Sequence, residues 1–189
     1  MELIIYNILI WISFIVFFSI SIIHNIYLRI KKIDNLGDFP IKKIWFFAGK
    51  ISMGICWAFC VIQSIGFNLS LIYNIEIIKW IGSIIFLIGS IISSITFFYL
   101  GTAGVFGLPN EDIKLQTKGI YKFSRNPMYL GFFLMSIGSS IFCINIFNII
   151  FCIVGILVHH KIVLSEEKFL FKKFKDDWIK YTKRVRRYI

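Results

Sequence analysis

Charged side chains and cysteines are both scarce in this sequence. Only 16% of the 189 residues are charged and 58% are hydrophobic, whereas a soluble domain has about 25% charged and roughly 45–50% apolar residues. This composition excludes an ordinary soluble domain, and it excludes a disordered chain. A secreted disulfide scaffold is disfavoured as well, because all of the few cysteines lie in apolar stretches. They are Cys56, Cys60, Cys143 and Cys152.

Acidic residues are outnumbered by basic ones, which leaves a net charge of +11. Nucleic acid is not the expected partner, because the basic residues gather between and after apolar runs, as they do at the cytoplasmic face of a membrane. Asp, Glu, Lys and Arg are missing from the middle of every apolar run. Transporters and proton pumps usually place such groups at that depth, so the pattern disfavours a transporter.

Three long apolar runs reach the roughly 20 residues that a helix needs to cross a bilayer. They are Leu3–Leu28, Ile51–Tyr73 and Trp80–Leu100. A fourth run, Met128–His160, would be roughly 50 Å long as one helix, and residues 143–148 predict a turn near its middle. We therefore expect an all-α polytopic membrane protein with about five transmembrane helices. The last two are expected to form a hairpin of Met128–Ile144 and Asn148–Leu164.

Lysine and arginine alternate between rich and poor segments along the chain. The segments 29–50 and 101–127 and the tail after residue 164 are rich in them, whereas residues 74–79 hold only Lys79 and the hairpin tip holds neither. Positively charged loops favour the cytoplasmic side. The alternation predicts an N-terminus outside and a cytoplasmic C-terminal helical tail. The plasma membrane of a microbe is the expected location, because Ile, Asn and Lys are abundant.

Asn126 and Pro127 are typical of a helix start, because Asn is a good N-cap and Pro suits the first helical position. The positive end of the helix dipole would face the preceding loop, where Arg125 lies. Together these features favour an anion or carboxylate at this point. The alternative is an ordinary capped loop at the membrane surface. Gly131 and Gly138 lie seven residues apart on one helical face and would permit close helix packing.

Aromatic and acidic side chains supply further candidates. Tyr121 and Tyr129 flank the helix start, and their faces could hold a cationic or sulfonium group, although an interfacial aromatic belt gives the same pattern. Glu166 and Glu167 oppose the basic bias of the tail. They could bind an amine or ribose hydroxyls, or pair with neighbouring lysines. His159 lies two helical turns before Glu166, so the two could share a face.

Two other patterns are weaker. The glycine-rich segment Gly101–Gly107 lacks the strand and the Gly-Lys-Ser/Thr sequence of a phosphate-binding loop, so it is predicted to be a flexible helix exit. No Cys/His spacing predicts a zinc site. Cys56 and Cys60 are expected to be buried apolar residues inside a helix.

Taken in order, these blocks resemble the isoprenylcysteine carboxyl methyltransferase family and its phospholipid methyltransferase relatives. The family pattern reads Leu-x-Thr-x-Gly-x-Tyr, Arg-His-Pro-x-Tyr, a helical hairpin, a Glu-Glu pair and an aromatic tail. The counterparts here are Leu115, Thr117, Gly119 and Tyr121, then Arg125–Tyr129, then Glu166–Glu167, and finally Phe174, Trp178, Tyr181 and Val185. The resemblance covers residues 113–189, and the first three runs match only in being apolar.

The resemblance implies a membrane enzyme that transfers a methyl group from S-adenosylmethionine to a lipophilic acceptor, either a prenylcysteine-like carboxylate or a lipid. We expect one structural domain, with three transmembrane helices and the cytoplasmic loop 29–50 in residues 1–100, and the cofactor-binding loop, the helical hairpin and the C-terminal tail in residues 101–189. The residues implied for the cofactor are Ile113, Lys114, Leu115, Gln116, Tyr121, Asn126, Pro127, Met128, Tyr129 and Glu166. Arg125 and Glu167 are implied in catalysis, and Lys161 in substrate binding.

Three positions depart from the family pattern. Asn126 replaces a common His, Ile113 stands where some members have His, and Ile162 replaces an Arg that prenylcysteine methyltransferases use for their substrate. The acceptor need not therefore be a prenylcysteine. Two other functions stay open: a membrane NADPH-dependent reductase of the sterol type, which shares a Trp-x-x-Tyr tail, and a non-catalytic membrane scaffold.

Overall fold

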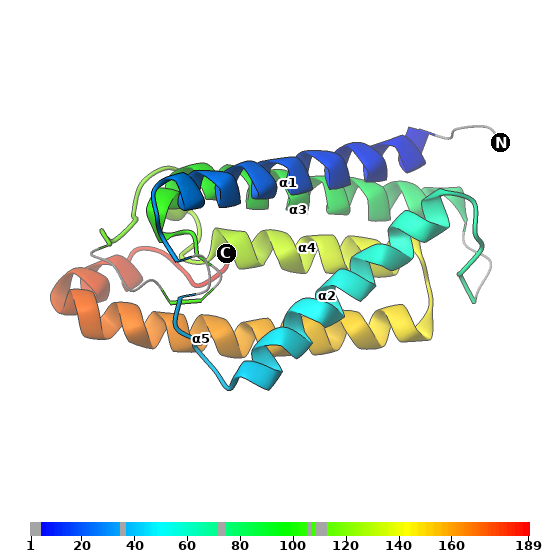
Figure 1. Cartoon of the computed structure of the whole chain (residues 1–189). Helices are drawn as coiled ribbons and strands as arrows, with labels where there is room; N and C mark the ends of the chain where they lie inside the picture. Colours follow the sequence, from blue (N-terminus) through cyan, green and yellow to red (C-terminus); the bar gives the residue numbers. More distant parts are fainter. Residues whose placement is uncertain (1–4, 35–36, 72–74, 106, 109–112) are drawn as a thin grey trace.

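The chain folds into long helices that lie side by side (Figure 1). The computed structural model describes residues 5–34, 37–71, 75–105, 107–108 and 113–189. Its elements are α1 (Ile5–Ile30), α2 (Lys43–Ser64), α3 (Glu76–Leu100), the short 3-10 helices η1 (Gly101–Ala103) and η2 (Gly119–Lys122), α4 (Pro127–Phe142) and α5 (Ile146–Thr182). The predicted all-α architecture is confirmed. The predicted ends of two runs, residues 3–4 and 72–73, lie outside the described residues.

Four helices are long and apolar enough to cross a membrane, namely α1, α2, α3 with the adjoining η1, and α5. The fifth, α4, has 16 residues and is therefore about 24 Å long, which is shorter than the hydrocarbon core of about 30 Å. It runs alongside α3 between the same two ends of the bundle (Figure 1). The chain is thus an integral multi-pass membrane protein, and its described residues form four helices of spanning length and one shorter apolar helix.

The second helix differs from its predicted bounds, because α2 begins at Lys43 and ends at Ser64 instead of covering 51–73. The charged residues Lys43 and Lys50 had marked the segment as a loop. Lysine stems can lie along apolar surface while the ammonium reaches a polar environment, so both residues are accommodated in the helix. At the other end, the Gln63 side chain accepts a hydrogen bond from the Leu69 amide at 2.8 Å, which turns the chain away from the helical path.

The predicted hairpin is present, with both ends of α4 and the start of α5 shifted by one to two residues. The Asn145 side chain caps α5 by accepting a hydrogen bond from the Phe147 amide at 2.9 Å. Asn148, the predicted first residue, is fully buried inside α5. Its amide nitrogen donates to the carbonyls of Ser139 and Cys143, both at 3.1 Å, and so ties the two arms together. Beyond the predicted end at residue 164, α5 continues as the expected helical tail and bends at Lys175.

Glycines bring α3 and α4 into backbone contact, as Gly131 and Gly138 predicted. A Cβ atom added to Gly131 would lie 2.6 Å from the carbonyl oxygen of Gly89, and one on Gly138 would lie 2.7 Å from that of Gly82. Side chains at these positions would force the helices apart. The contact matters for the site because it sets the position of the first turn of α4.

The three basic segments of the chain meet at one end of the bundle, opposite the N-terminal end of α1 (Figure 1). Asp38 and Leu108 join two of them through paired backbone hydrogen bonds of 3.0 and 2.7 Å. The Arg125 amide donates to the Arg186 carbonyl at 3.0 Å and so joins the second segment to the C-terminal tail. The three basic segments therefore lie together at one end of the bundle, as the sequence predicted.

Candidate active site

A cavity of about 350 Å³ lies at this end of the bundle. It is enclosed by the segment after α3, the first turn of α4 and the part of α5 that follows its apolar stretch. All of the residues predicted for cofactor binding line it: Ile113, Lys114, Leu115, Gln116, Tyr121, Asn126, Pro127, Met128, Tyr129 and Glu166. They come from three separate segments, so the tertiary fold brings the predicted set together. We call this space the loop cavity.

Glu166 and Tyr129 are linked across the loop cavity. The Tyr129 hydroxyl donates to Glu166 Oε1 at 2.5 Å. Because Pro127 starts α4, Tyr129 lies in the first helical turn, and the antiparallel α5 brings Glu166 next to it just beyond its apolar part. Tyr129 is 5% exposed, and Glu166 is partly buried. The result is one acidic group held at the inner wall of the cavity.

Aromatic side chains form another wall of the loop cavity. Tyr121, Trp178 and Tyr181 all line it and are buried. The Tyr181 hydroxyl donates to the Tyr121 carbonyl at 2.7 Å, and burial raises the pKa of Tyr121 far above its ordinary value, so its phenol stays neutral. The aromatic tail pattern noted in the sequence therefore has a defined position: Trp178, Tyr181 and Val185 pack together against Leu115.

Glu167 belongs to a polar cluster beside the cavity and is not among the residues that line it. Its Oε1 accepts from Arg125 Nε at 3.1 Å and from Asn126 Nδ2 at 3.0 Å. Its Oε2 accepts from Arg187 Nη2 at 2.9 Å. Arg125 does line the cavity, and its Nη1 also donates to the Val185 carbonyl at 2.8 Å. These contacts fasten the loop before α4 to the C-terminal segment.

Asn126 occupies the N-cap position of α4, as predicted, but its side chain makes no capping hydrogen bond. The amide instead donates to Glu167 and, at 3.3 Å, to the Arg187 carbonyl. The expectation of an ordinary side-chain cap was wrong, because a buried carboxylate attracts the amide more strongly than the helix end does.

Lys161 is exposed on α5 and lines neither the loop cavity nor the second cavity described below. Its neighbour Ile162, at the position where the resemblance has Arg, is completely buried. His160 contacts the C-terminal segment through a hydrogen bond of 2.8 Å between Nδ1 and the Tyr188 hydroxyl. The substrate role of Lys161 is therefore without structural support.

The segment after α3 contributes more than the sequence suggested. Thr102, Ala103, Gly104 and Val105 line the loop cavity, although the segment was predicted only as a flexible exit. The Gly104 carbonyl and His24 Nε2 are 3.0 Å apart in a hydrogen bond that reaches from α1. A Cβ on Gly104 would lie 2.5 Å from that same nitrogen. Glycine is thus needed there for the close approach of α1. Phe106, within the predicted segment, lies outside the described residues.

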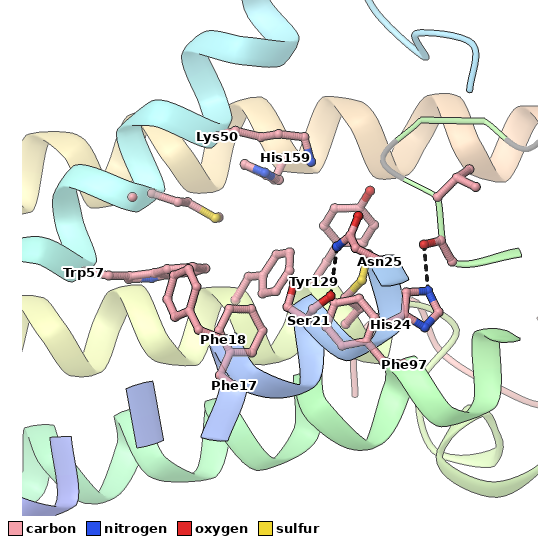
Figure 2. Close-up of a pocket in the computed structure, with 16 residues that line it drawn as sticks. Phe17, Phe18, Ser21, His24, Asn25, Lys50, Trp57, Phe97, Tyr129 and His159 are labelled. Carbon is pink, nitrogen blue, oxygen red and sulfur yellow. Dashed lines mark hydrogen bonds between the residues drawn. The ribbon is translucent and has the colours of Figure 1, made fainter. Parts of the chain in front are cut away.

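A second cavity of about 290 Å³ lies inside the helix bundle, and we call it the bundle cavity (Figure 2). It is lined by α1, α2, α3, α4 and α5, with Phe17, Phe18 and Trp57 at one end and His24 at the other (Figure 2). Sequence reasoning missed it. The signal was the helical spacing of Lys50, Met53, Gly54 and Trp57, which places these four residues on one face of α2.

The two cavities share a wall. Gly104, Val105, Met128 and Tyr129 line both of them. A group bound in the loop cavity and a group bound in the bundle cavity would therefore lie on opposite sides of the same few residues.

Comparison with known proteins gives the chain its family. The sequence profile of the phospholipid methyltransferase family matches residues 77–177, just over half of the chain. The matched part covers α3, α4 and most of α5, which hold the loop cavity. Protein-S-isoprenylcysteine O-methyltransferase of Schizosaccharomyces pombe is 32% identical over 77 residues, which cover 40% of this chain and 33% of that protein. The match thus spans about a third of the relative's length. This chain belongs to the phospholipid methyltransferase family.

Proposed function

We propose that this protein is an S-adenosylmethionine-dependent methyltransferase that methylates a lipophilic acceptor from the bilayer. One observation carries the proposal: the loop cavity and the bundle cavity meet at the wall formed by Gly104, Val105, Met128 and Tyr129. Family membership favours methyl transfer over the reductase and scaffold alternatives.

The residues of the loop cavity fit the proposed cofactor. Its volume of about 350 Å³ lies within the usual range for small-molecule sites, roughly 300–1,000 Å³. The Glu166 carboxylate has about four acceptor positions, so it can accept from an amine or from ribose hydroxyls in addition to Tyr129. The aromatic rings of Tyr121 and Trp178 suit a sulfonium. The first turn of α4 suits a carboxylate, because backbone N–H groups and the helix dipole favour an anion there.

When bound, S-adenosylmethionine supplies a methyl group on positively charged sulfur, and the electron pair of the broken S–C bond stays on that sulfur while the acceptor atom forms the new bond. The protein's task is therefore chiefly alignment and exclusion of water. Tyr129 is held by Glu166 at the shared wall, where the two ligands must meet. A carboxylate acceptor needs no base, whereas an amine acceptor would first have to lose a proton.

Arg125 and Glu167, implied in catalysis by the resemblance, are better assigned a positioning role. Both are largely buried, with side chains 11% and 10% exposed, and they bind each other and the C-terminal segment. We infer that this cluster closes the outer side of the loop cavity by fastening the tail across it.

The lipophilic acceptor has a direct path from the bilayer into the bundle cavity. Phe18 is 38% exposed, and Gly54 is exposed with nothing within 4 Å of an added Cβ. Both residues also line the cavity. Their positions on α1 and α2 mark an opening between these helices. The basic segments at the loop-cavity end support a cytoplasmic position for that end by the positive-inside rule, where the cofactor would be available, with the N-terminus outside.

Binding of S-adenosylmethionine to detergent-purified protein tests the cofactor site. Glu166→Ala and Tyr121→Ala should each weaken it, Glu166→Ala by about 10- to 150-fold, because a hydrogen bond to a charged group contributes roughly 1.5–3 kcal/mol. Asp176→Ala, which removes an exposed acid of the tail, is the matched control and should bind normally. Wild-type affinity in both site variants would refute the assignment.

Transfer of a labelled methyl group tests the reaction itself. The purified protein should methylate a component of a total lipid extract or a prenylcysteine analogue. Cofactor binding without transfer to either would favour a non-catalytic protein. Tight binding of NADPH in place of S-adenosylmethionine would favour the reductase.

A further inference from the structure

Lys50 brings a positive charge to the bundle cavity. It lies roughly 10 Å along α2 from the helix start, on the same face as Met53, Gly54 and Trp57, and it lines the cavity. The ammonium lies 4.6 Å from the centroid of the Phe46 ring. Figure 2 shows Lys50 and His159 beside each other at the cavity, away from the aromatic end formed by Phe17, Phe18 and Trp57. The cavity thus has a polar end and an aromatic end.

His159 adds a hydrogen-bonding group next to Lys50. It is 2% exposed, and its Nδ1 lies 2.9 Å from the Gly155 carbonyl. Since a carbonyl can only accept, Nδ1 is the donor, and Nε2 of the neutral ring is an acceptor. The acceptor position of the ring therefore suits a neighbour that is an ammonium or a protonated group.

Acidic and basic side chains are distributed differently in the two cavities: Glu166 lines the loop cavity together with the basic residues Lys114 and Arg125, whereas Lys50 lines the bundle cavity. Glu166 is the acidic residue on the loop-cavity side of the shared wall, and Lys50 is the basic residue on the bundle-cavity side. Tyr129 lines both spaces and binds Glu166. A cationic group is favoured on the Glu166 side, and an anionic group on the Lys50 side. S-adenosylmethionine is the cation that this arrangement fits.

We propose that Lys50 binds the anionic head of the methyl acceptor, and that this acceptor is a single-chain lipophilic carboxylate. The inference rests on the proposed function and adds the residue that selects the acceptor. An ammonium acceptor would meet the like charge of Lys50, whereas a carboxylate is attracted to it and aligned toward the cofactor across the shared wall.

The size of the bundle cavity supports a single chain. A volume of about 290 Å³ holds roughly ten groups of the size of a water molecule or a methylene. One prenyl or acyl chain fits among Phe17, Trp57 and Phe132, with its end extending toward the bilayer at Phe18 and Gly54. Two chains side by side would each place only about five such groups inside this volume.

Lys50 lies outside the part of the chain that matches the family profile, which begins at residue 77. The positive charge that would select the acceptor thus belongs to α2, and the family profile does not cover this helix. The other lysine considered for the substrate, Lys161, is exposed and away from both cavities.

A binding experiment without methyl donor tests this role separately from catalysis. The probes are N-acetyl-S-farnesylcysteine, a carboxylate, and its carboxamide, which has the same shape without the charge. Wild-type protein should bind the carboxylate at least tenfold more tightly. Lys50→Gln should abolish this preference and weaken carboxylate binding about 10- to 150-fold, the range for a lost charged hydrogen bond. Lys50→Arg should restore most of it.

Lys43→Gln is the matched control, because Lys43 is an exposed lysine of the same helix and lines neither cavity. It should keep the wild-type preference. Equal binding of both probes by the wild type, or a preference that survives Lys50→Gln, would overturn the proposal. So would competition by vesicles of a two-chain anionic phospholipid as strong as that of the carboxylate, because it would mean that the site takes a two-chain phosphate lipid.

The outcomes also separate this inference from the proposed function. Charge-selective binding that depends on Lys50, in a protein that transfers no methyl group, would support the carboxylate site and refute the enzyme. Methyl transfer with no dependence on Lys50 would support the enzyme and refute the role of Lys50.

Discussion

Replacing Glu167 with Gln should open the loop cavity while leaving its lining residues unchanged. Glu167 accepts hydrogen bonds from Arg125, Asn126 and Arg187. These donors belong to the loop before α4 and to the C-terminal segment. The neutral amide keeps the volume of the side chain but removes the charge that both guanidinium groups face.

The size of the effect follows from the burial of the partners. Arg125 and Glu167 have side chains only 11% and 10% exposed, and breaking a buried pair costs about 3–5 kcal/mol because the remaining charge is left uncompensated. Arg187 is 37% exposed, so its pair contributes about 1 kcal/mol or less. Glutamine can still accept one hydrogen bond. We therefore expect a loss of about 2–4 kcal/mol, which raises the population with a detached tail about 30-fold to several hundredfold.

Hydrogen exchange of the backbone amides measures this change directly. The amides of residues 183–187 should exchange faster in Glu167→Gln by that factor, and affinity for S-adenosylmethionine should fall with it. Glu76→Gln, the same substitution at an exposed acid at the opposite end of the bundle, should leave exchange in the tail unchanged. Unaltered exchange in Glu167→Gln would show that the cluster does not fasten the tail, and the positioning role would be lost.

Two further substitutions test the path of the acceptor and the frame of the site. Gly54→Trp should obstruct the opening between α1 and α2 and raise the KM for the lipophilic acceptor without changing affinity for S-adenosylmethionine. Ile51→Trp, on an exposed part of the same helix, should leave both the KM and this affinity unchanged. An unchanged KM in Gly54→Trp would mean that the opening lies elsewhere. Gly131→Val should push α4 away from the Gly89 carbonyl. The substitution should lower the free energy of unfolding by about 1–3 kcal/mol or more, measured as a lower thermal midpoint in detergent. A midpoint equal to that of the wild type would contradict the close packing.

Much of the architecture could be predicted from the sequence, because it depends on local properties of the chain. Long uncharged runs identify membrane helices, and the alternation of lysine and arginine identifies which ends belong together. The hairpin was visible because a single helix from Met128 to His160 would be too long. The boundary of α2 was wrong because charge alone was read as the end of a helix, whereas the lysine stems of Lys43 and Lys50 are compatible with one.

The residues of the loop cavity were also accessible from the sequence, because they adjoin the ends of helices whose direction was already set. Residues 113–129 precede and begin α4, and Glu166 follows the apolar part of α5. Once the hairpin brings those ends to one side, the candidates have to lie near each other. The contact between Tyr129 and Glu166 forms because the hairpin brings the start of α4 beside the end of the apolar part of α5.

Only the tertiary structure shows which of two adjacent residues faces a cavity and which helices contribute side chains to the same cavity. Successive residues of a helix point about 100° apart, so Glu166 faces the loop cavity while Glu167 faces Arg125 and Arg187, and the sequence does not say how α5 is rotated. The same holds for Lys50, whose position depends on how α2 packs against α1 and α5. Local sequence determines which segments are helices and where they end, whereas the rotation and packing of each helix determine which side chains share a cavity.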